Sequence, residues 1–115
     1  PIKIFILNNQ YMGMVRQWQE LLHEKNYSES YTAALPDFVK LAEAYGCVGI
    51  QAKKPDELDE KINEMLNVNK PVIFDCVVDP NENCFPMIPS GKPHNQMLLG
   101  PEDEEEISSE GKVLV

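Results

Sequence analysis

The chain has 115 residues, which is enough for one small domain with a single hydrophobic core. Its formal net charge of -9 is opposite to the basic surface that binding to nucleic acid or to an anionic membrane requires. Three cysteines without a Cys-x-x-Cys spacing, and two isolated histidines, argue against a zinc site and favour a reducing compartment such as the cytoplasm.

The apolar run Ile4–Leu7 predicts a buried strand close to the start of the chain. Because the chain begins at Pro1 and enters this strand almost at once, we expect it to be a piece of a longer protein. This run stops at Asn8 and Asn9 and turns through Gly13 into a helix. In open α/β sheets, ligands bind beyond the carboxyl ends of the strands, where a helix N-terminus can meet an anion. Asn9 is therefore a candidate ligand for a phosphate-bound metal, although paired asparagines also occur in turns and caps without any ligand.

Three helices are expected, each with apolar residues at helical spacing. They run from Met14 to about Lys25, from Asp37 to Tyr45 before Gly46, and from Pro55 to Leu66. The first is expected to bury Met14, Trp18, Leu21 and Leu22 and to carry its polar side chains on other faces. The stretch from Asn26 to Leu35 has no periodicity and reads as a surface loop.

Two further strands are expected, at Cys47–Ala52 and Pro71–Val78. Strands separated by helices predict an α/β fold with a parallel sheet and flanking helices. Three strands make a narrow sheet with exposed edges, which we expect upstream strands to cover. Five prolines after residue 79 predict an extended C-terminal arm at residues 80–101, and the acidic block at residues 102–106 predicts a solvated tail at residues 102–115.

Residues 7–18 resemble the cofactor loop of thiamine-diphosphate enzymes, and in particular that of the acetolactate synthases. The resemblance continues through residues 36–46, 54–58, 71–75 and 86–91, and covers the chain from Pro1 to about Gly100. It implies that residues 1–79 are the C-terminal part of a thiamine-diphosphate-binding domain. The opening Gly-Asp-Gly half of the diphosphate motif has no counterpart in this sequence.

The resemblance implies roles for seven residues of the loop and the arm. These are metal ligation by the side chain of Asn9 and the backbone carbonyl of Tyr11, cofactor binding by Asn9, Gly13 and Met14, and lining of the substrate channel by Val15, Trp18 and Ser90. Read without the resemblance, Gly13 is an ordinary hinge, Ser90 is a turn residue, and Met14, Val15 and Trp18 are core residues. No catalytic residue is implied in this chain, because the family's activating glutamate belongs to an N-terminal domain.

The implied reaction joins two pyruvates, or pyruvate and 2-ketobutyrate, to a 2-acetohydroxyacid with loss of CO2, in branched-chain amino-acid biosynthesis. The implied cofactors are thiamine diphosphate and Mg²⁺, with FAD held by a domain that has no counterpart here. We expect the full chain to form a homodimer or tetramer with a possible regulatory small subunit, in the cytoplasm or in a plastid. This chain alone is expected to be inactive, with no nucleic-acid or membrane partner.

Two alternatives stay open. One is another thiamine-diphosphate enzyme, such as glyoxylate carboligase, pyruvate oxidase or a 2-keto acid decarboxylase. The other is a free-standing module that uses the same strand, loop and helix to bind a phosphate ligand or to dock on a partner.

Overall fold

The computed structural model describes residues 1–101, so the expected acidic tail at residues 102–115 lies outside the described residues. Within them the chain forms two compact units. The first consists of residues 1–10 and 33–81, and the second, in its described part, of residues 11–32 and 82–101.

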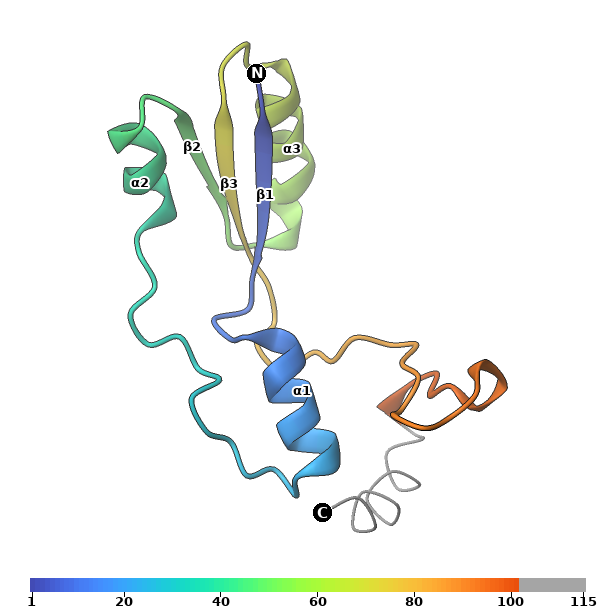
Figure 1. Cartoon of the computed structure of the whole chain (residues 1–115). Coiled ribbons are helices and arrows are strands. Elements are labelled where there is room, and N and C mark those ends of the chain that lie inside the picture. The colour runs from blue at the N-terminus through green and yellow to red at the C-terminus, as the bar shows by residue number, and fades with distance from the viewer. Residues whose placement is uncertain (102–115) are drawn as a thin grey trace. The chain divides into compact units, whose positions relative to one another are not determined.

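The first unit contains a three-stranded sheet of β1 (Lys3–Asn8), β2 (Val48–Ala52) and β3 (Val72–Val77). The strands pair in parallel in the order β1-β3-β2, so their carboxyl ends lie at the same edge (Figure 1). The predicted parallel sheet is confirmed. β3 is central, which explains why its sequence is almost continuously apolar.

The expectation of a buried first strand is wrong for the described residues. β1 is an edge strand, and Ile4, Phe5 and Leu7 are exposed, Leu7 by 69%. The reason is that only β3 pairs with β1 among the described strands, so its outer edge has no neighbour there. The exposed apolar flank that a narrow sheet predicts is therefore present.

One face of the sheet packs against α3 (Leu58–Asn67), which follows the 3₁₀ turn η1 (Pro55–Glu57) and runs behind the strands in Figure 1. Side chains alternate along a strand, so every second residue of β2 and β3 points to this face. The resulting core contains Ile50, Ala52, Val72, Phe74, Cys76 and, from α3, Met65. The third predicted helix is thus confirmed.

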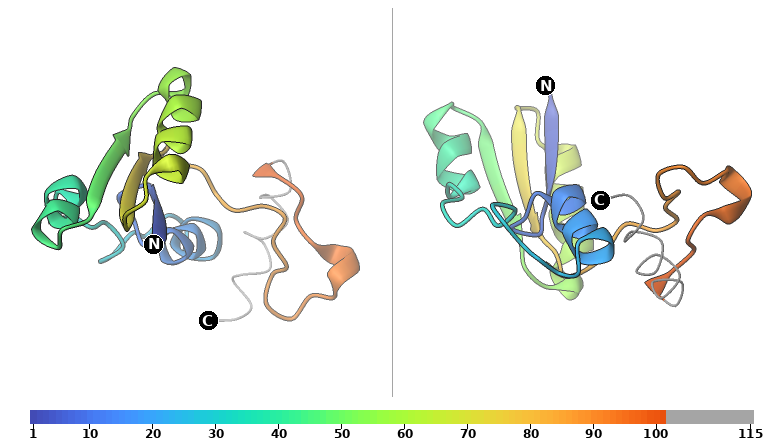
Figure 2. Two further views of the ribbon diagram at one scale, coloured as in Figure 1. Left: turned by 90° about the horizontal axis from the view of Figure 1, so that it is seen from above. Right: turned by 60° about the horizontal axis from the view of Figure 1, so that its bottom comes forward.

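The other face of the sheet is approached by α2 (Phe38–Ala44) at Gly49 of β2 (Figure 2, left). Its start is capped by Asp37, whose carboxylate accepts a hydrogen bond from the Lys40 backbone N–H at 3.1 Å. Gly46 follows the helix with φ +73°, a left-handed conformation typical of the residue after a helix.

The second unit contains α1 (Gly13–Leu22), the loop after it, and the arm. Its small core contains Leu21 with Met87 and Leu98, which pair in an isolated antiparallel bridge. The described arm has no element longer than the 3₁₀ turn η2 (His94–Gln96), as its prolines predict. The loop at residues 26–35 is also confirmed.

Helix α1 differs from the prediction in its length and in its buried face. It ends at Leu22 and not near Lys25, because Glu24 and Lys25 both have positive φ. Arg16 and Gln17 are buried, whereas Met14 and Trp18 are exposed. The predicted burial therefore holds for Leu21 and, in part, for Leu22, but not for Met14 or Trp18.

Candidate functional site

The first candidate residues lie where β1 ends in the first unit. Asn8 is the last residue of β1, and half-buried Asn9 follows it directly. The Asn8 side-chain oxygen accepts a hydrogen bond from the Gln10 backbone N–H at 3.1 Å. Gln10 has φ +63°, so the chain turns here through the left-handed region. Asn9 thus lies in a tight turn at the carboxyl edge of the sheet, where ligands of open α/β folds bind.

A buried carboxylate supports this turn from the neighbouring strand. Asp75 of β3 is 3% exposed, and its two oxygens accept hydrogen bonds from Asn8 Nδ2 at 2.9 Å and Gln51 Nε2 at 2.7 Å. One polar side chain from each strand therefore meets on the same face. Sequence reasoning missed this group, although a single charge inside the apolar run Val72–Val77 was the signal that could have found it.

In the second unit, α1 begins without a carboxylate. Met12 stands at the N-cap position of α1, and its side chain makes no capping hydrogen bond. The first turn of α1 contains no acidic residue. The other described α-helices differ: Asp37 caps α2, and Glu57, just before α3, accepts the backbone N–H groups of Lys53 and Lys54. Those backbone hydrogen bonds lower the pKa of Asp37 and of Glu57 below the usual carboxyl values. The start of α1 therefore suits an anion that comes from outside the chain.

Tyr11 lies just before α1, and its backbone pairs with Tyr31 in an isolated antiparallel bridge. The two rings are 5.1 Å apart, and the Arg16 guanidinium lies 5.5 Å from the centre of the Tyr11 ring. The next backbone N–H, that of Met12, donates to the Ser30 carbonyl at 2.8 Å. The backbone around Tyr11 is thus held on one side by the loop.

The three residues predicted for the substrate channel are exposed. Val15 and Trp18 lie on α1, and Trp18 is 46% exposed. Ser90 lies in a turn of the arm where the Lys92 backbone N–H donates to the Pro89 carbonyl at 3.1 Å. For Met14, Val15 and Trp18, the reading as core residues does not hold within the described residues, because all three are exposed.

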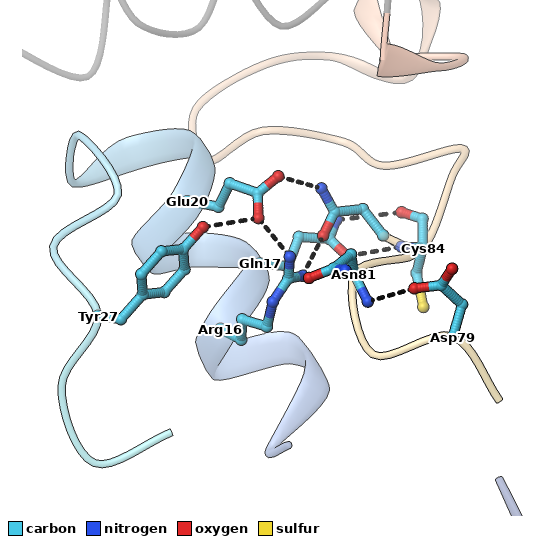
Figure 3. Close-up of polar contacts among 8 residues, drawn as sticks. Arg16, Gln17, Glu20, Tyr27, Asp79, Asn81 and Cys84 are labelled. Atoms are coloured by element: carbon cyan, nitrogen blue, oxygen red, sulfur yellow. Dashed lines mark hydrogen bonds and ion pairs between the residues drawn. The ribbon is translucent and has the colours of Figure 1, made fainter. Parts of the chain in front are cut away.

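Polar side chains of α1 meet the start of the arm in a cluster that we call the α1 clasp. It consists of Arg16, Gln17 and Glu20 of α1 with Asn83 and Cys84 of the arm. Figure 3 labels Arg16, Gln17, Glu20 and Cys84. Arg16 donates to Glu20 at 2.6 Å and to Asn83 at 3.0 Å, and Asn83 donates back to Glu20 at 3.0 Å. The Gln17 amide bonds both backbone groups of Cys84, accepting from its N–H at 2.6 Å and donating to its carbonyl at 3.1 Å. The clasp thus ties α1 to the start of the arm.

Tyr27 extends the clasp from the loop, because its hydroxyl donates to Glu20 at 2.9 Å. Partial desolvation, followed by that hydrogen bond, raises the pKa of Tyr27 above its usual value. Sequence reasoning placed Arg16 and Gln17 on other faces of the helix and missed the clasp. The spacing of Arg16 and Glu20 permits a local ion pair, but no local signal could have found Asn83 and Cys84, which lie 67 positions after Arg16 and Gln17.

Residues 1–76 match the family described as thiamine pyrophosphate enzyme, C-terminal TPP binding domain. The chain belongs to this family. Thiamine pyrophosphate is thiamine diphosphate, and its diphosphate group is an anion of the kind that the start of α1 suits. The predicted fold class and family are therefore confirmed.

Curated relatives match most of the chain. It is 45% identical over 106 residues to the acetolactate synthase large subunit of Haemophilus influenzae, which covers 91% of this chain and 18% of that protein. It is 47% identical over 98 residues to the large subunit of Cyanidium caldarium, covering 84% of this chain and 17% of that protein. Isozyme 3 of Escherichia coli is 45% identical over 102 residues, with 86% and 18% covered. The chain thus spans less than a fifth of these relatives.

Two kinds of structure are absent from residues 1–101. No helix there is long and apolar enough to cross a membrane. No group of three or more His, Cys, Asp or Glu side chains is placed there as a metal site would require. The second finding is compatible with the predicted Mg²⁺ ligands, which are an amide oxygen and a backbone carbonyl, with the remaining oxygens coming from diphosphate and water.

Proposed function

We propose that this chain is the C-terminal part of the thiamine-diphosphate-binding domain of an acetolactate synthase catalytic subunit. The observation that carries this proposal is the 45–47% identity to acetolactate synthase large subunits over 84–91% of the chain. The substrates would be two pyruvates, or pyruvate and 2-ketobutyrate, and the product a 2-acetohydroxyacid of branched-chain amino-acid biosynthesis.

Asn9 and Tyr11 are the proposed ligands of Mg²⁺, through the side-chain oxygen of Asn9 and the backbone carbonyl of Tyr11. Mg²⁺ prefers about six oxygen ligands in an octahedral arrangement and takes several of them from phosphate and water. The position of Asn9 after the end of β1 supports this role, since that edge is where α/β sheets bind ligands.

Gly13 and Met14 begin α1, and we assign their backbone to the diphosphate of the cofactor. The support is the helix start itself, which has neither a side-chain cap nor a first-turn carboxylate to compete with an anion. When bound, thiamine diphosphate supplies the carbanion chemistry of decarboxylation and condensation. This chain contributes cation ligands, helix amides and channel walls, and no general base is assigned to it.

Val15, Trp18 and Ser90 are the proposed residues of the substrate channel. Two apolar side chains that α1 leaves exposed in the described structure support the assignment, because apolar surface suits a pocket for small keto acids. The full enzyme would also hold FAD in another domain, assemble as a homodimer or tetramer, and bind a regulatory small subunit. Its expected location is the cytoplasm, or the plastid of a plant or alga.

The test is an assay of the intact gene product that contains this segment. With thiamine diphosphate and Mg²⁺ present, we expect pyruvate to give acetolactate and one CO2 for each product formed, and added 2-ketobutyrate to give acetohydroxybutyrate. Removal of the divalent cation by a chelator should abolish turnover, and added Mg²⁺ should restore it. Acetaldehyde, acetyl phosphate or, from glyoxylate, tartronate semialdehyde as the main product would instead identify one of the alternative enzymes.

A further inference from the structure

Asp75 is a buried acidic residue to which the proposed function assigns no role. It is 3% exposed and lies in the central strand, between Ile6 of β1 and Gln51 of β2 in the strand register. A carboxylate at such a position is costly unless its charge is compensated by hydrogen bonds, and an apolar side chain there would avoid the cost. The groups that donate hydrogen bonds to Asp75 therefore indicate what its burial is for.

The hydrogen bonds of Asp75 define the orientation of a neighbouring amide. A carboxylate can only accept hydrogen bonds, so the Asn8 side chain must present its nitrogen to Asp75, and does so at 2.9 Å. The Asn8 oxygen then points away from Asp75 and accepts the Gln10 backbone N–H at 3.1 Å. Gln51 donates to the second carboxylate oxygen at 2.7 Å.

The Asn8 side chain in turn holds Gln10, a residue whose backbone has an unfavourable conformation. Gln10 has φ +63°, a conformation that residues other than glycine adopt at a cost in free energy. Its backbone N–H donates to the side-chain oxygen of Asn8. Asn9 lies between these two residues, so the hydrogen bond from the Gln10 backbone N–H to the Asn8 side-chain oxygen closes a turn around it. Asp75, Asn8 and Gln10 thus form a chain of contacts that ends at the backbone on both sides of Asn9.

We propose that Asp75 is a positioning residue for the metal-binding loop, acting through the Asn8 amide to fix the turn that carries Asn9. This inference rests on the proposed role of Asn9 as a ligand of Mg²⁺. Partners that orient a ligand commonly change metal affinity by about 10- to 100-fold when they are removed. Asp75 itself does not touch the cation or the substrate in this proposal.

The test uses the intact enzyme, with Mn²⁺ as a spectroscopic probe for Mg²⁺ and thiamine diphosphate present at saturation. Asp75→Asn keeps the size of the side chain but gives it a donor, so the Asn8 amide loses its fixed orientation. We expect the dissociation constant for Mn²⁺ to rise by about 10-fold or more. Asn8→Ala, which removes the relay without changing Asp75, should give a similar rise.

A double variant and a matched control separate positioning from general loosening of the sheet. If Asp75 acts through Asn8, adding Asp75→Asn to Asn8→Ala should weaken Mn²⁺ binding no further. Gln51→Ala removes the other hydrogen bond of Asp75, so it should lower the unfolding temperature of the cofactor-free protein and leave Mn²⁺ affinity unchanged. Additive losses in the double variant, or an equal loss of affinity in Gln51→Ala, would overturn the inference.

Asn9→Ala in the same titration distinguishes the two levels of the argument. If Asn9→Ala weakens Mn²⁺ binding while Asp75→Asn and Asn8→Ala do not, the ligand assignment stands and the positioning role is wrong. If Asn9→Ala has no effect, the ligand assignment itself fails and the positioning role fails with it.

Discussion

Helix α2 approaches the sheet at Gly49, where an added Cβ would lie 2.7 Å from both the Cα and the carbonyl oxygen of Val39. Those neighbours are backbone atoms, so they cannot rotate away as the end of a side chain could. The absent side chain at Gly49 therefore lets the backbone of α2 come directly against β2. Gln51, two residues further along β2, points to the same face of the sheet and donates a hydrogen bond to Asp75.

Gly49→Ala should destabilise the protein, because the helix must move away from the strand to accommodate the methyl group. Overpacking of this kind costs about 1 to 3 kcal/mol in the free energy of unfolding. Denaturant unfolding of the intact protein measures the change. Gly100→Ala is the matched control, since its Cβ would have nothing within 4 Å, and its effect should stay within about 0.5 kcal/mol. Equal effects of the two substitutions would show that α2 does not pack as described.

Helix α1 and the start of the arm are joined by polar contacts as well as by apolar ones. The Gln17 side chain is 1% exposed and pairs with the Cys84 backbone as another strand would, through one accepted and one donated bond. Arg16, Glu20 and Asn83 close a ring of hydrogen bonds beside it. Because Trp18 and Ser90 belong to these two segments, the clasp bears on how the proposed channel residues are held.

Gln17→Leu tests the clasp, because leucine has a similar volume but leaves the Cys84 N–H without its acceptor. Loss of this part-buried hydrogen bond costs about 0.5 to 1.5 kcal/mol, so the arm should open locally more often. Amide hydrogen exchange of the intact protein should become faster at Cys84 and stay unchanged in β3. Gln96→Leu, the same change at an exposed position of η2, should have no effect on Cys84. Unchanged exchange at Cys84 in Gln17→Leu would mean that the clasp does not hold the arm.

The elements that could be predicted from the sequence are those with local signals. Asp37 and Gly46 mark both ends of α2, and the β-branched run at residues 72–77 marks β3. The burial of Arg16 and Gln17 on α1 could not be predicted, because it depends in part on Asn83 and Cys84, which lie far along the chain. The exposed position of β1 depended on the strand order, which the sequence pattern does not contain.

In the candidate site, too, some features have a local sequence signal and others depend on contacts between distant parts of the chain. The loop from Asn9 to Met14 could be assigned from its resemblance to a family that the comparisons then confirmed. The support beneath it, from Asp75 through Asn8, required the register that places residues 75 and 8 on neighbouring strands. A sequence read one element at a time does not show which side chains meet across a sheet.

At the scale of the whole molecule, the described chain supplies two sets of groups. The first unit contains Asn9 after β1, and the second contains the start of α1, the exposed residues proposed for the channel, and the arm. The chain spans less than a fifth of its acetolactate synthase relatives, so the complete reaction belongs to the proposed full enzyme. The central claim that can be tested on this chain's own residues is that Asn9 binds the cation that holds thiamine diphosphate.

The most direct test is a binding titration of the intact enzyme with Asn9→Ala, measuring Mg²⁺ and thiamine diphosphate separately by calorimetry. Because the cation links the protein to the diphosphate, loss of one ligand should weaken both, the cation by about 10-fold or more. The unfolding temperature without cofactor should change little, which distinguishes lost binding from lost folding. Unchanged affinity for both Mg²⁺ and thiamine diphosphate would contradict the account and leave Asn9 as a turn residue alone.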